Sequence, residues 1–292
     1  MIREIKLPRD RMVDFSKGCL VMGIINCTPD SFYLGSRKPS VSEALETAKV
    51  MIDAGVHLLD VGGESSRPGA SYVDADSETS RVVPVVEGIR KFSGLPLSVD
   101  TRKYAVAKAA VEAGADMIND ISSLSDDLKL GPYAAETGLP VILMHKRGTP
   151  ETMQIKPFYE DPVGEVLAEI EASVERAERF GIVRERIIID PGIGFGKRYS
   201  DNLLLLQVLE RFRALGLPLL VGVSRKSFIG RALADAAGRE RDAGERLAGT
   251  LGAHAWCIMK GAQIVRVHDV RETMDVLKVL TAIAGDFTEQ GN

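Results

Sequence analysis

The sequence predicts an α/β protein of the TIM barrel class, with eight parallel strands that are each followed by a helix. The first observation is a unit that recurs eight times: a short apolar run ends in a polar residue, and an amphipathic stretch follows it. The second is length, because 292 residues accommodate the ~250 residues typical of this fold. The third is the lack of a glycine-rich first turn, which a doubly wound sheet, the competing fold, would carry.

The predicted strands are continuous apolar runs, as expected for parallel strands that are buried on both faces. They lie at residues 20–25, 58–61, 97–99, 117–118, 141–144, 187–189, 219–223 and 264–267. Helix starts support this order: Ser40 with Glu43 forms a capping-box pattern, and Asp161 with Pro162 begins another helix. Glycines are expected to end the helices before the strands, at Gly55, Gly114, Gly138, Gly181, Gly216 and Gly261.

The chain is expected to form a single domain over residues 1–292, with the barrel core at about 18–285, because no linker or composition change divides it. Lys and Arg total 37 against 41 Asp and Glu, and this net charge of −4 excludes binding to nucleic acid through bulk positive charge. No apolar run approaches the ~20 residues that span a membrane. The charged N-terminus and three widely spaced cysteines indicate a cytoplasmic protein.

The predicted active-site face is the carboxyl end of the strands, whose loops carry the chemistry in this fold. Polar side chains follow the apolar runs there: Asn26, Glu64, Asp100, Asn119, Asp120, His145, Asp190, Lys226, Arg266 and His268. Any one of them could equally cap a helix or satisfy a structural hydrogen bond. Capping explains ten such residues around one rim poorly, and the set indicates a binding site.

The rim residues fall into two chemical kinds. Asp100, Asn119 and Asp190 supply acceptors and an amide, which suit the edge of a flat heterocycle. The basic residues lie after the last two strands, a frequent phosphate-binding position in this fold: Arg225, Lys226, Arg266 and His268. The expected ligand therefore has a flat polar head and an anionic tail.

Three loops are also informative. The glycine-rich run at 192–197 is not a phosphate loop, because no Ser or Thr follows its lysine and the glycine spacing differs. We expect a tight turn whose backbone approaches a ligand, with Phe195 either in the core or beside the substrate. Residues 27–39 and 64–75 are long compared with the usual ~2–6 residues of such loops, and are expected to be lids or disordered segments. Arg67 in the second of them suits an anion.

Short motifs lie at nearly every strand end, in order from about residue 20 to 280. They are residues 26–32 (NCTPDSF), 62–69 (GGESSRPG), 98–101 (SVDT), 118–120 (IND), 143–145 (LMH), 190–197 (DPGIGFGK), 224–227 (SRKS) and 266–270 (RVHDV). Together they resemble the motifs of the dihydropteroate synthase family of pterin-binding enzymes.

The resemblance implies a transferase of folate biosynthesis that is a target of sulfonamides. It would join 6-hydroxymethyl-7,8-dihydropterin pyrophosphate to 4-aminobenzoate and release pyrophosphate and 7,8-dihydropteroate. The implied cofactor is Mg²⁺, and the implied partners are these small molecules and a second copy of the chain. Neither nucleic acid nor membrane is expected as a partner.

The resemblance also implies the role of each site residue. The pterin would be held by Asp100, Asn119, Asp190 and Lys226, with Met144 lining its pocket. The pyrophosphate would be held by Asn26, Arg266 and His268, with Asn26 as the residue near the metal. The aminobenzoate would be surrounded by Ser66, Arg67, Phe195, Lys226 and Ser227. The implied catalytic residues are Asp100, Asp190, Lys226 and Arg266.

The chemistry expected from this set is a dissociative substitution. Pyrophosphate would leave with its charge absorbed by Mg²⁺, Arg266 and His268. The exocyclic CH₂ of the pterin would become cationic, stabilised by ring conjugation and by Asp100 and Asp190, before the neutral amine attacks. A covalent enzyme intermediate is not needed.

The chain departs from the family pattern in its two long loops. Leu34 stands where an acid is usual, and Ser66 replaces a common Thr. Without this acid, a contact between it and Arg67 cannot form. The residues that the resemblance assigns to pterin and pyrophosphate are all present, so activity is expected to survive.

Two other functions remain open. A pterin-dependent methyltransferase on a similar barrel would share the pterin-site acids, but needs no pyrophosphate site and usually works with a corrinoid domain. A non-catalytic pterin-binding protein would not require Asn26, Arg266 and His268.

Overall fold

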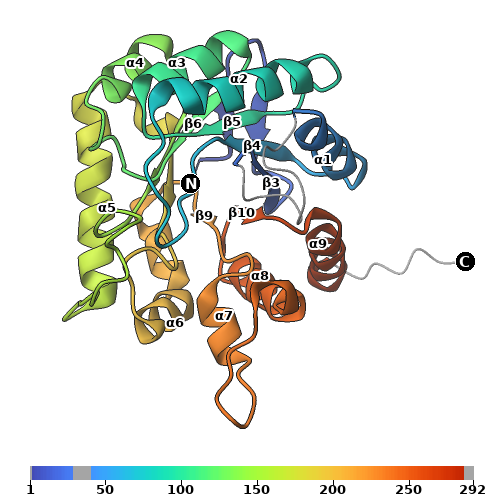
Figure 1. Ribbon diagram of the computed structural model, residues 1–292, viewed down its shortest axis with the longest axis vertical. Coiled ribbons are helices and arrows are strands. Elements are labelled where there is room, and N and C mark those ends of the chain that lie inside the picture. Colours follow the sequence, from blue (N-terminus) through green and yellow to red (C-terminus); the bar gives the residue numbers. More distant parts are fainter. Residues whose placement is uncertain (1, 29–40, 286–292) are drawn as a thin grey trace, which may run out of the picture.

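The computed structural model describes residues 2–28 and 41–285, and its centre is a barrel of eight parallel strands (Figure 1). They are β3 (Leu20–Asn26), β4 (Leu58–Gly62), β5 (Leu97–Asp100), β6 (Met117–Asp120), β7 (Val141–Met144), β8 (Ile187–Asp190), β9 (Leu220–Val221) and β10 (Ile264–Val267). The hydrogen-bonded order is β8-β7-β6-β5-β4-β3-β10-β9, and a parallel bridge between Ile189 and Leu219 closes the ring. The predicted TIM barrel and its eight strands are confirmed.

Helices surround the barrel (Figure 1). They are α1 (Val41–Asp53), α2 (Ala75–Arg90), α3 (Tyr104–Ala113), α4 (Leu130–Thr137), α5 (Pro162–Arg179), α6 (Tyr199–Gln207), α7 (Ser227–Ala232), α8 (Leu247–Met259) and α9 (Val270–Ala284). The Asp161 carboxylate caps α5 by accepting from the Gly164 backbone N–H at 3.0 Å, as predicted. All the glycines predicted to end helices have positive φ. Ser40 lies outside the described residues. None of the described helices is both long and apolar enough to cross a membrane.

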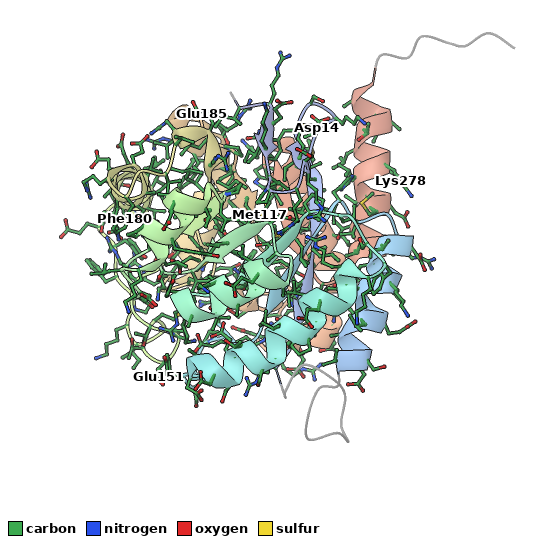
Figure 2. All side chains as sticks on the ribbon, turned by 90° about the horizontal axis from the view of Figure 1, so that it is seen from above. Asp14, Met117, Glu151, Phe180, Glu185 and Lys278 are labelled. Atoms are coloured by element: carbon green, nitrogen blue, oxygen red, sulfur yellow. The ribbon has the colours of Figure 1, made fainter. Side chains whose placement is uncertain are left out.

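Alternate residues of each strand point into the barrel. The part of this interior nearest the amino ends of the strands, called the lower layer, is apolar. One buried cluster contains the inward side chains Leu20, Met22, Leu58, Met117, Ile142, Ile188, Leu220 and Ile264. Met117 lies near the middle of the molecule in Figure 2. The outward side chains, such as Val21 and Leu59, pack in a second cluster against the helices.

An N-terminal hairpin, which the sequence analysis did not predict, closes the amino end of the barrel. Strands β1 (Glu4–Lys6) and β2 (Met12–Asp14) pair antiparallel, and Ile5 and Val13 pack into the apolar cluster of the barrel interior. The alternation of charged and apolar residues around Ile5, followed by a turn at Pro8, is a hairpin signal in the sequence. The hairpin supplies the apolar side chains that shield this end of the core from water.

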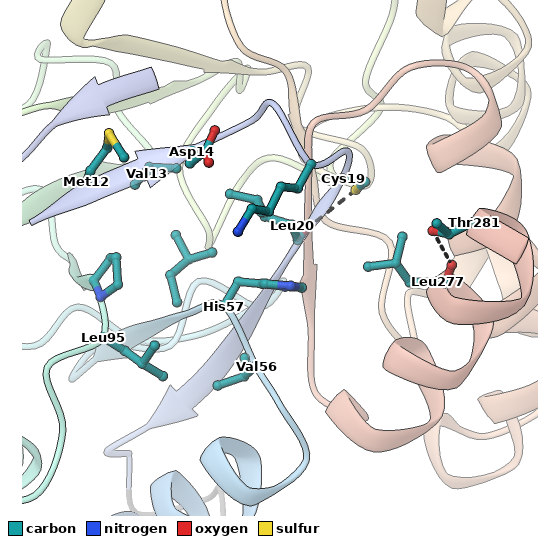
Figure 3. A pocket seen from close by; sticks show the side chains of 13 residues that line it. Met12, Val13, Asp14, Cys19, Leu20, Val56, His57, Leu95, Leu277 and Thr281 are labelled. Atoms are coloured by element: carbon teal, nitrogen blue, oxygen red, sulfur yellow. Dashed lines mark hydrogen bonds between the residues drawn. The ribbon is translucent and has the colours of Figure 1, made fainter. Parts of the chain in front are cut away.

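A cavity of about 340 Å³ lies beside the hairpin at the amino end. Figure 3 shows Val13 of β2 and Leu277 of α9 on opposite sides of it, with His57 between them. The His57 Nδ1 accepts from the Val21 backbone N–H at 2.9 Å, so this histidine helps fix the start of β3. The cavity is therefore at the opposite end of the barrel from the predicted site.

Candidate active site

At the carboxyl end, the inward positions of the same strands carry polar side chains. Asp60, Asp100, Asn119, Asp190 and Arg266 each lie two residues after an inward position of their strands, as Asp60 follows Leu58 and Asn119 follows Met117. Strand pairing sets Asp100 opposite Asn119 and opposite Gly62 of the neighbouring strands. The barrel therefore has a polar interior layer directly above its apolar one.

Arg266 connects this layer across the barrel. Its Nε donates to Asp60 Oδ2 at 2.6 Å, and its Nη2 donates to Asp100 Oδ2 at 2.7 Å. The amide of Asn119 donates to the same Asp60 oxygen at 3.0 Å. Asp60 is fully buried, and it fixes two residues of the predicted site. Asp60 was not among the predicted site residues because it lies inside the apolar run at 58–61, although an acid in such a run is itself an unusual signal.

Burial and charge act in opposite directions on these groups. Burial raises the pKa of Asp100 to about 7, although the Arg266 charge opposes the rise. Burial also acts to lower the pKa of Arg266, but Asp60 and Asp100 outweigh it, and the pKa is raised. The guanidinium is therefore a permanent cation at the mouth of the barrel. It lies beside the Asp100 carboxyl group, whose pKa is close to neutral pH.

The layer also contains a second carboxyl group, Asp190, and a second cation, Lys226, and the charge of each affects the pKa of the other. Asp190 Oδ1 accepts from the Gly192 backbone N–H at 2.7 Å, and burial raises the pKa of this carboxyl while the Lys226 charge opposes the rise. Burial lowers the pKa of Lys226 to about 8. The Lys226 ammonium donates to the Ile193 carbonyl and lies 4.4 Å from the Phe195 ring centroid. A cation, a carboxylate and an aromatic ring thus meet at one side of the mouth.

His268 contacts the side chain of Ser224, whose role was not predicted from the sequence. The Ser224 Oγ accepts from the His268 backbone N–H at 3.2 Å and lies 2.9 Å from its Nδ1. We assign the hydroxyl proton to the bond with Nδ1, and with this assignment Nε2 carries the imidazole hydrogen. Burial lowers the pKa of His268 to about 4, and the charges of Arg266 and Arg67 act in the same direction. His268 is a neutral hydrogen-bond donor.

The other predicted residues lie around this layer. Asn26 ends β3 opposite Gly62, and Met144 ends β7 opposite Asp190. Arg67 is exposed, and its positive charge helps to lower the pKa of His268. Ser66 is half-buried on the same loop, and Ser227 is the exposed first residue of α7. The structure thus brings together the residues that the resemblance assigns to pterin and pyrophosphate, and places Ser66, Arg67 and Ser227 around them.

Four rim residues have structural partners instead. Asp120 accepts from the Ser122 and Leu124 backbone N–H groups, both at 2.7 Å, and so caps a turn. Arg225, grouped above with the phosphate-binding cations, makes a bidentate ion pair with Asp269 at 2.6 and 2.8 Å. His145 and Glu64 are likewise engaged, with Glu169 and with Arg102 respectively.

The loop after β4 is ordered by charge. Glu64 pairs with Arg102 and Lys103, both at 3.0 Å, and accepts from the Val73 backbone N–H. The Gly69 backbone N–H donates to the Pro150 carbonyl at 2.9 Å, so the loop contacts the segment after β7. Between these segments lies a cavity of about 170 Å³. Of the other long loop, residues 29–40, including Leu34, lie outside the described residues.

The described residues contain no cluster of three or more His, Cys, Asp or Glu side chains that could hold a metal ion. Asn26 offers a neutral carboxamide oxygen, which is a hard ligand suited to Mg²⁺. Mg²⁺ in phosphate sites commonly takes one or two protein oxygens and completes its shell with substrate phosphates and water. The donor set therefore fits a metal that arrives with a diphosphate, and does not fit a metal held by protein alone.

Comparison with known proteins agrees with this geometry. Residues 22–268 match the family described as pterin binding enzyme. The chain is 47% identical to dihydropteroate synthase of Escherichia coli over 262 residues, which cover 90% of each protein. It is similar to the solved structure of Yersinia pestis dihydropteroate synthase with a sulfonamide drug, with a TM-score of 0.89, 41% identity, and coverage of 96% of this chain and 99% of that one. It is also similar to Xanthomonas albilineans dihydropteroate synthase with 4-aminobenzoic acid, with a TM-score of 0.87, 42% identity, and coverage of 94% and 96%.

Proposed function

Since the chain belongs to the pterin binding enzyme family, among its dihydropteroate synthases, and is therefore a transferase of folate biosynthesis, we propose which of its residues carry the reaction. The observation that supports the assignment is the polar interior layer. It combines two buried carboxyl groups, an amide and a lysine with the permanent cation Arg266.

The pterin ring binds in this layer. Asp190 and Asp100 accept hydrogen bonds from the N–H groups of the ring edge, and the amide of Asn119 reads a neighbouring position. Met144, in register with Asp190, supplies an apolar contact for the ring. Lys226 donates to an acceptor of the ring from the side of the Phe195 aromatic group.

The pyrophosphate binds above the pterin. Arg266 and the Nε2–H of His268 supply donors for its oxygens, and Asn26 is the protein ligand of a magnesium ion that accompanies the diphosphate. When bound there, Mg²⁺ adds positive charge that stabilises the leaving group. Arg266 acts on the same charge, because its guanidinium is held in position by Asp60 before the reaction begins.

The bond between the pterin CH₂ and the pyrophosphate oxygen breaks first. Asp100 and Asp190 stabilise the positive charge that develops on the pterin, and the neutral amine of aminobenzoate then attacks the CH₂. The aminobenzoate lies between Ser66 and Arg67, on the loop after β4, Phe195, in the turn after β8, and Lys226 and Ser227, at the start of α7. The attacking amine loses its proton to solvent or to the departing pyrophosphate.

A covalent route through the enzyme has little support. The Ser224–His268 contact of 2.9 Å has the form of a nucleophile–base pair, but a histidine with a pKa near 4 is a weak base. Burial raises the pKa of the Cys27 thiol to about 12, so it is not a thiolate at neutral pH.

We also propose a homodimer in the cytoplasm. Two helices that pack together each carry exposed apolar side chains, Trp256 and Met259 on α8 and Val279 and Ile283 on α9. Three free thiols fit a reducing compartment. Light scattering should give twice the 31.6 kDa chain mass, and Met259→Asp should shift it toward the monomer. A wild-type monomer would contradict the dimer.

The test of the proposed function is an assay with both substrates and Mg²⁺. The expected result is release of pyrophosphate together with 7,8-dihydropteroate, with a sulfonamide competing against aminobenzoate. Methyl transfer to a corrinoid acceptor would indicate the methyltransferase, and pterin binding without pyrophosphate release would indicate a binding protein.

A further inference from the structure

Lys197 is a buried lysine that the proposed reaction does not use. It ends the glycine-rich turn after β8 and is only 2% exposed. Its Nζ lies 2.8 Å from His145 Nδ1, 2.9 Å from the Gly192 carbonyl and 3.0 Å from the Phe195 carbonyl. Among the described residues no carboxylate forms an ion pair with it. The His145 carbonyl lies further away, at 3.5 Å, so acceptors are present for all three N–H donors of an ammonium group.

His145 connects Lys197 to helix α5. The His145 Nε2 lies 2.9 Å from Glu169 Oε2, and its Nδ1 faces the lysine. Because an ammonium can only donate, Nδ1 is the acceptor and Nε2 carries the proton that Glu169 accepts. Glu169 also binds Arg147, which in turn pairs with Glu165. The turn is thus connected to helix α5 by a chain of hydrogen bonds from Lys197 through His145 to Glu169.

The turn itself is tightly packed against the end of β7. Gly192 has a φ of +63°, and a Cβ at this residue would lie 1.8 Å from the His145 carbonyl oxygen. Other side chains hold the outer part of the turn, since Asn202 Oδ1 accepts from the Gly194 backbone N–H at 2.6 Å. The inner part, with the Gly192 and Phe195 carbonyls, is held by Lys197.

Two groups of the proposed substrate site depend on the shape of this turn. The Ile193 carbonyl accepts from Lys226, and the Phe195 ring lies 4.4 Å from the same ammonium. The carbonyls that Lys197 binds flank Ile193 on either side and include that of Phe195 itself. A change in the shape of the turn would therefore move the Phe195 ring, whereas Asp100 and Asn119 are held by strands β5 and β6.

We propose that Lys197 is a positioning residue whose buried ammonium, held by His145 and Glu169, shapes the 191–197 turn so that Phe195 and Lys226 are presented to aminobenzoate. This inference rests on the proposed function, because it assigns the effect to the aminobenzoate subsite. Burial lowers the pKa of Lys197 to about 7, so the ammonium form predominates only below neutral pH and the kinetic tests are best made at about pH 6.

Lys197→Met tests the inference, because it keeps the length of the side chain and removes its donors. We expect the KM for aminobenzoate to rise about tenfold or more. The dissociation constant of the pterin pyrophosphate should rise by a clearly smaller factor, because Lys226 and Asp190 contact this turn but Asp100 and Asn119 do not. A merely structural role would weaken both substrates together. Lys108→Met, at an exposed lysine paired with Glu112 on α3, is the matched control and should leave all constants unchanged.

Glu169→Gln covers the case in which Lys197→Met does not fold. Glu169 is about 42% exposed, and glutamine retains an acceptor for His145 while losing the charge. We expect the aminobenzoate KM to rise about two- to fivefold, again with a smaller change in pterin affinity.

A folded Lys197→Met with an unchanged aminobenzoate KM, or with equal losses for both substrates, overturns the inference. If Lys197→Met does not fold, an unchanged KM in Glu169→Gln overturns it. Both outcomes presuppose an active wild type. A wild-type protein that releases no pyrophosphate would instead refute the proposed function.

Discussion

The two layers of the barrel interior are built on the same strands but do different work. Asp14 of the hairpin and Glu151 of the loop after β7 lie on opposite sides of Met117 in Figure 2, and so mark the two ends of the barrel. Toward the hairpin, Leu58 and Met117 form a closed apolar core. Two residues further along the same strands, Asp60 and Asn119 belong to a network of ion pairs and hydrogen bonds.

The difference shows where this protein accepts an energetic cost. Burying apolar side chains stabilises the fold by about 25 cal/mol for each Å² removed from water. Burying Asp60 and Arg266 together recovers little more than the cost of desolvating them, because buried ion pairs are often no better than apolar packing. The lower layer therefore contributes most to stability, and the upper layer keeps charges in fixed positions for a ligand.

The largest expected effect is on the upper layer. Arg266→Met removes the cation that connects Asp60 and Asp100 and that is proposed to bind pyrophosphate. We expect kcat/KM to fall on the order of 10³-fold or more, as for the loss of a key electrostatic group. Steady-state kinetics would measure it. Activity within tenfold of wild type would contradict the placement of pyrophosphate at this cation.

Met117→Ala makes the opposite change, in the lower layer. Met117 is fully buried, and its truncation should cost about 2–5 kcal/mol of the free energy of unfolding. The kcat/KM of the folded enzyme should change less than about threefold. Denaturant unfolding and kinetics on the same sample would test this. A large loss of activity in a fully folded sample would show that the two layers are not independent.

Asp190→Asn tests recognition of the pterin edge. The amide places a donor where the proposed ring N–H also donates, and a buried mismatch of this kind costs about 1–3 kcal/mol. We expect pterin affinity to weaken at least about tenfold while the fold persists. Calorimetry would measure the affinity, and an unchanged value would remove Asp190 from the site.

A pH series tests Asp100, whose pKa is raised to about 7. Between pH 7.5 and 6 the carboxyl group gains a proton, so pterin affinity should fall by about an order of magnitude. Lys226, with a pKa near 8, stays mostly protonated over this range, and His268, with a pKa near 4, stays neutral. Lys197, with a pKa of about 7, also titrates here, so a variant of Asp100 is needed to separate the two groups. The Asp100→Asn variant should bind more weakly and without this pH dependence. A wild-type affinity that stays constant across the range would contradict the prediction.

The same shift has a consequence for stability. Because the folded pKa of Asp100 lies above the unfolded value near 3.9, the native state holds the proton that the unfolded state has released. The contribution of Asp100 to stability is therefore greatest at low pH and decreases as pH rises from about 4 to about 7.

Ser224→Ala should have the smallest effect. It removes the hydroxyl that contacts the His268 Nδ1, so the imidazole loses a partner that orients it toward the proposed pyrophosphate site. We expect the KM for the pterin substrate to rise less than about tenfold, with kcat nearly unchanged. Substrate titration would show this, and a loss as large as that of Arg266→Met would mean that Ser224 itself contacts the substrate.

The sequence by itself determined the eight strands, the end of the barrel that carries the chemistry, and most of the polar groups found there. These features are local, because strand runs, helix caps and strand-end polar residues are properties of neighbouring residues in the chain. The motifs made the resemblance to dihydropteroate synthases recognisable for the same reason. Even the N-terminal hairpin had a local signal in the alternation around Ile5.

Only the tertiary structure decided which polar groups pair with one another. Asp60 meets Arg266 across 206 residues of sequence, and Lys197 meets His145 across 52. Arg225 and Asp120 resemble site residues in the sequence, but Asp269 and the backbone of the following turn bind them. A side chain's type and spacing show what it can bind, whereas its actual partner depends on where distant strands place their ends, and that is a property of the closed barrel.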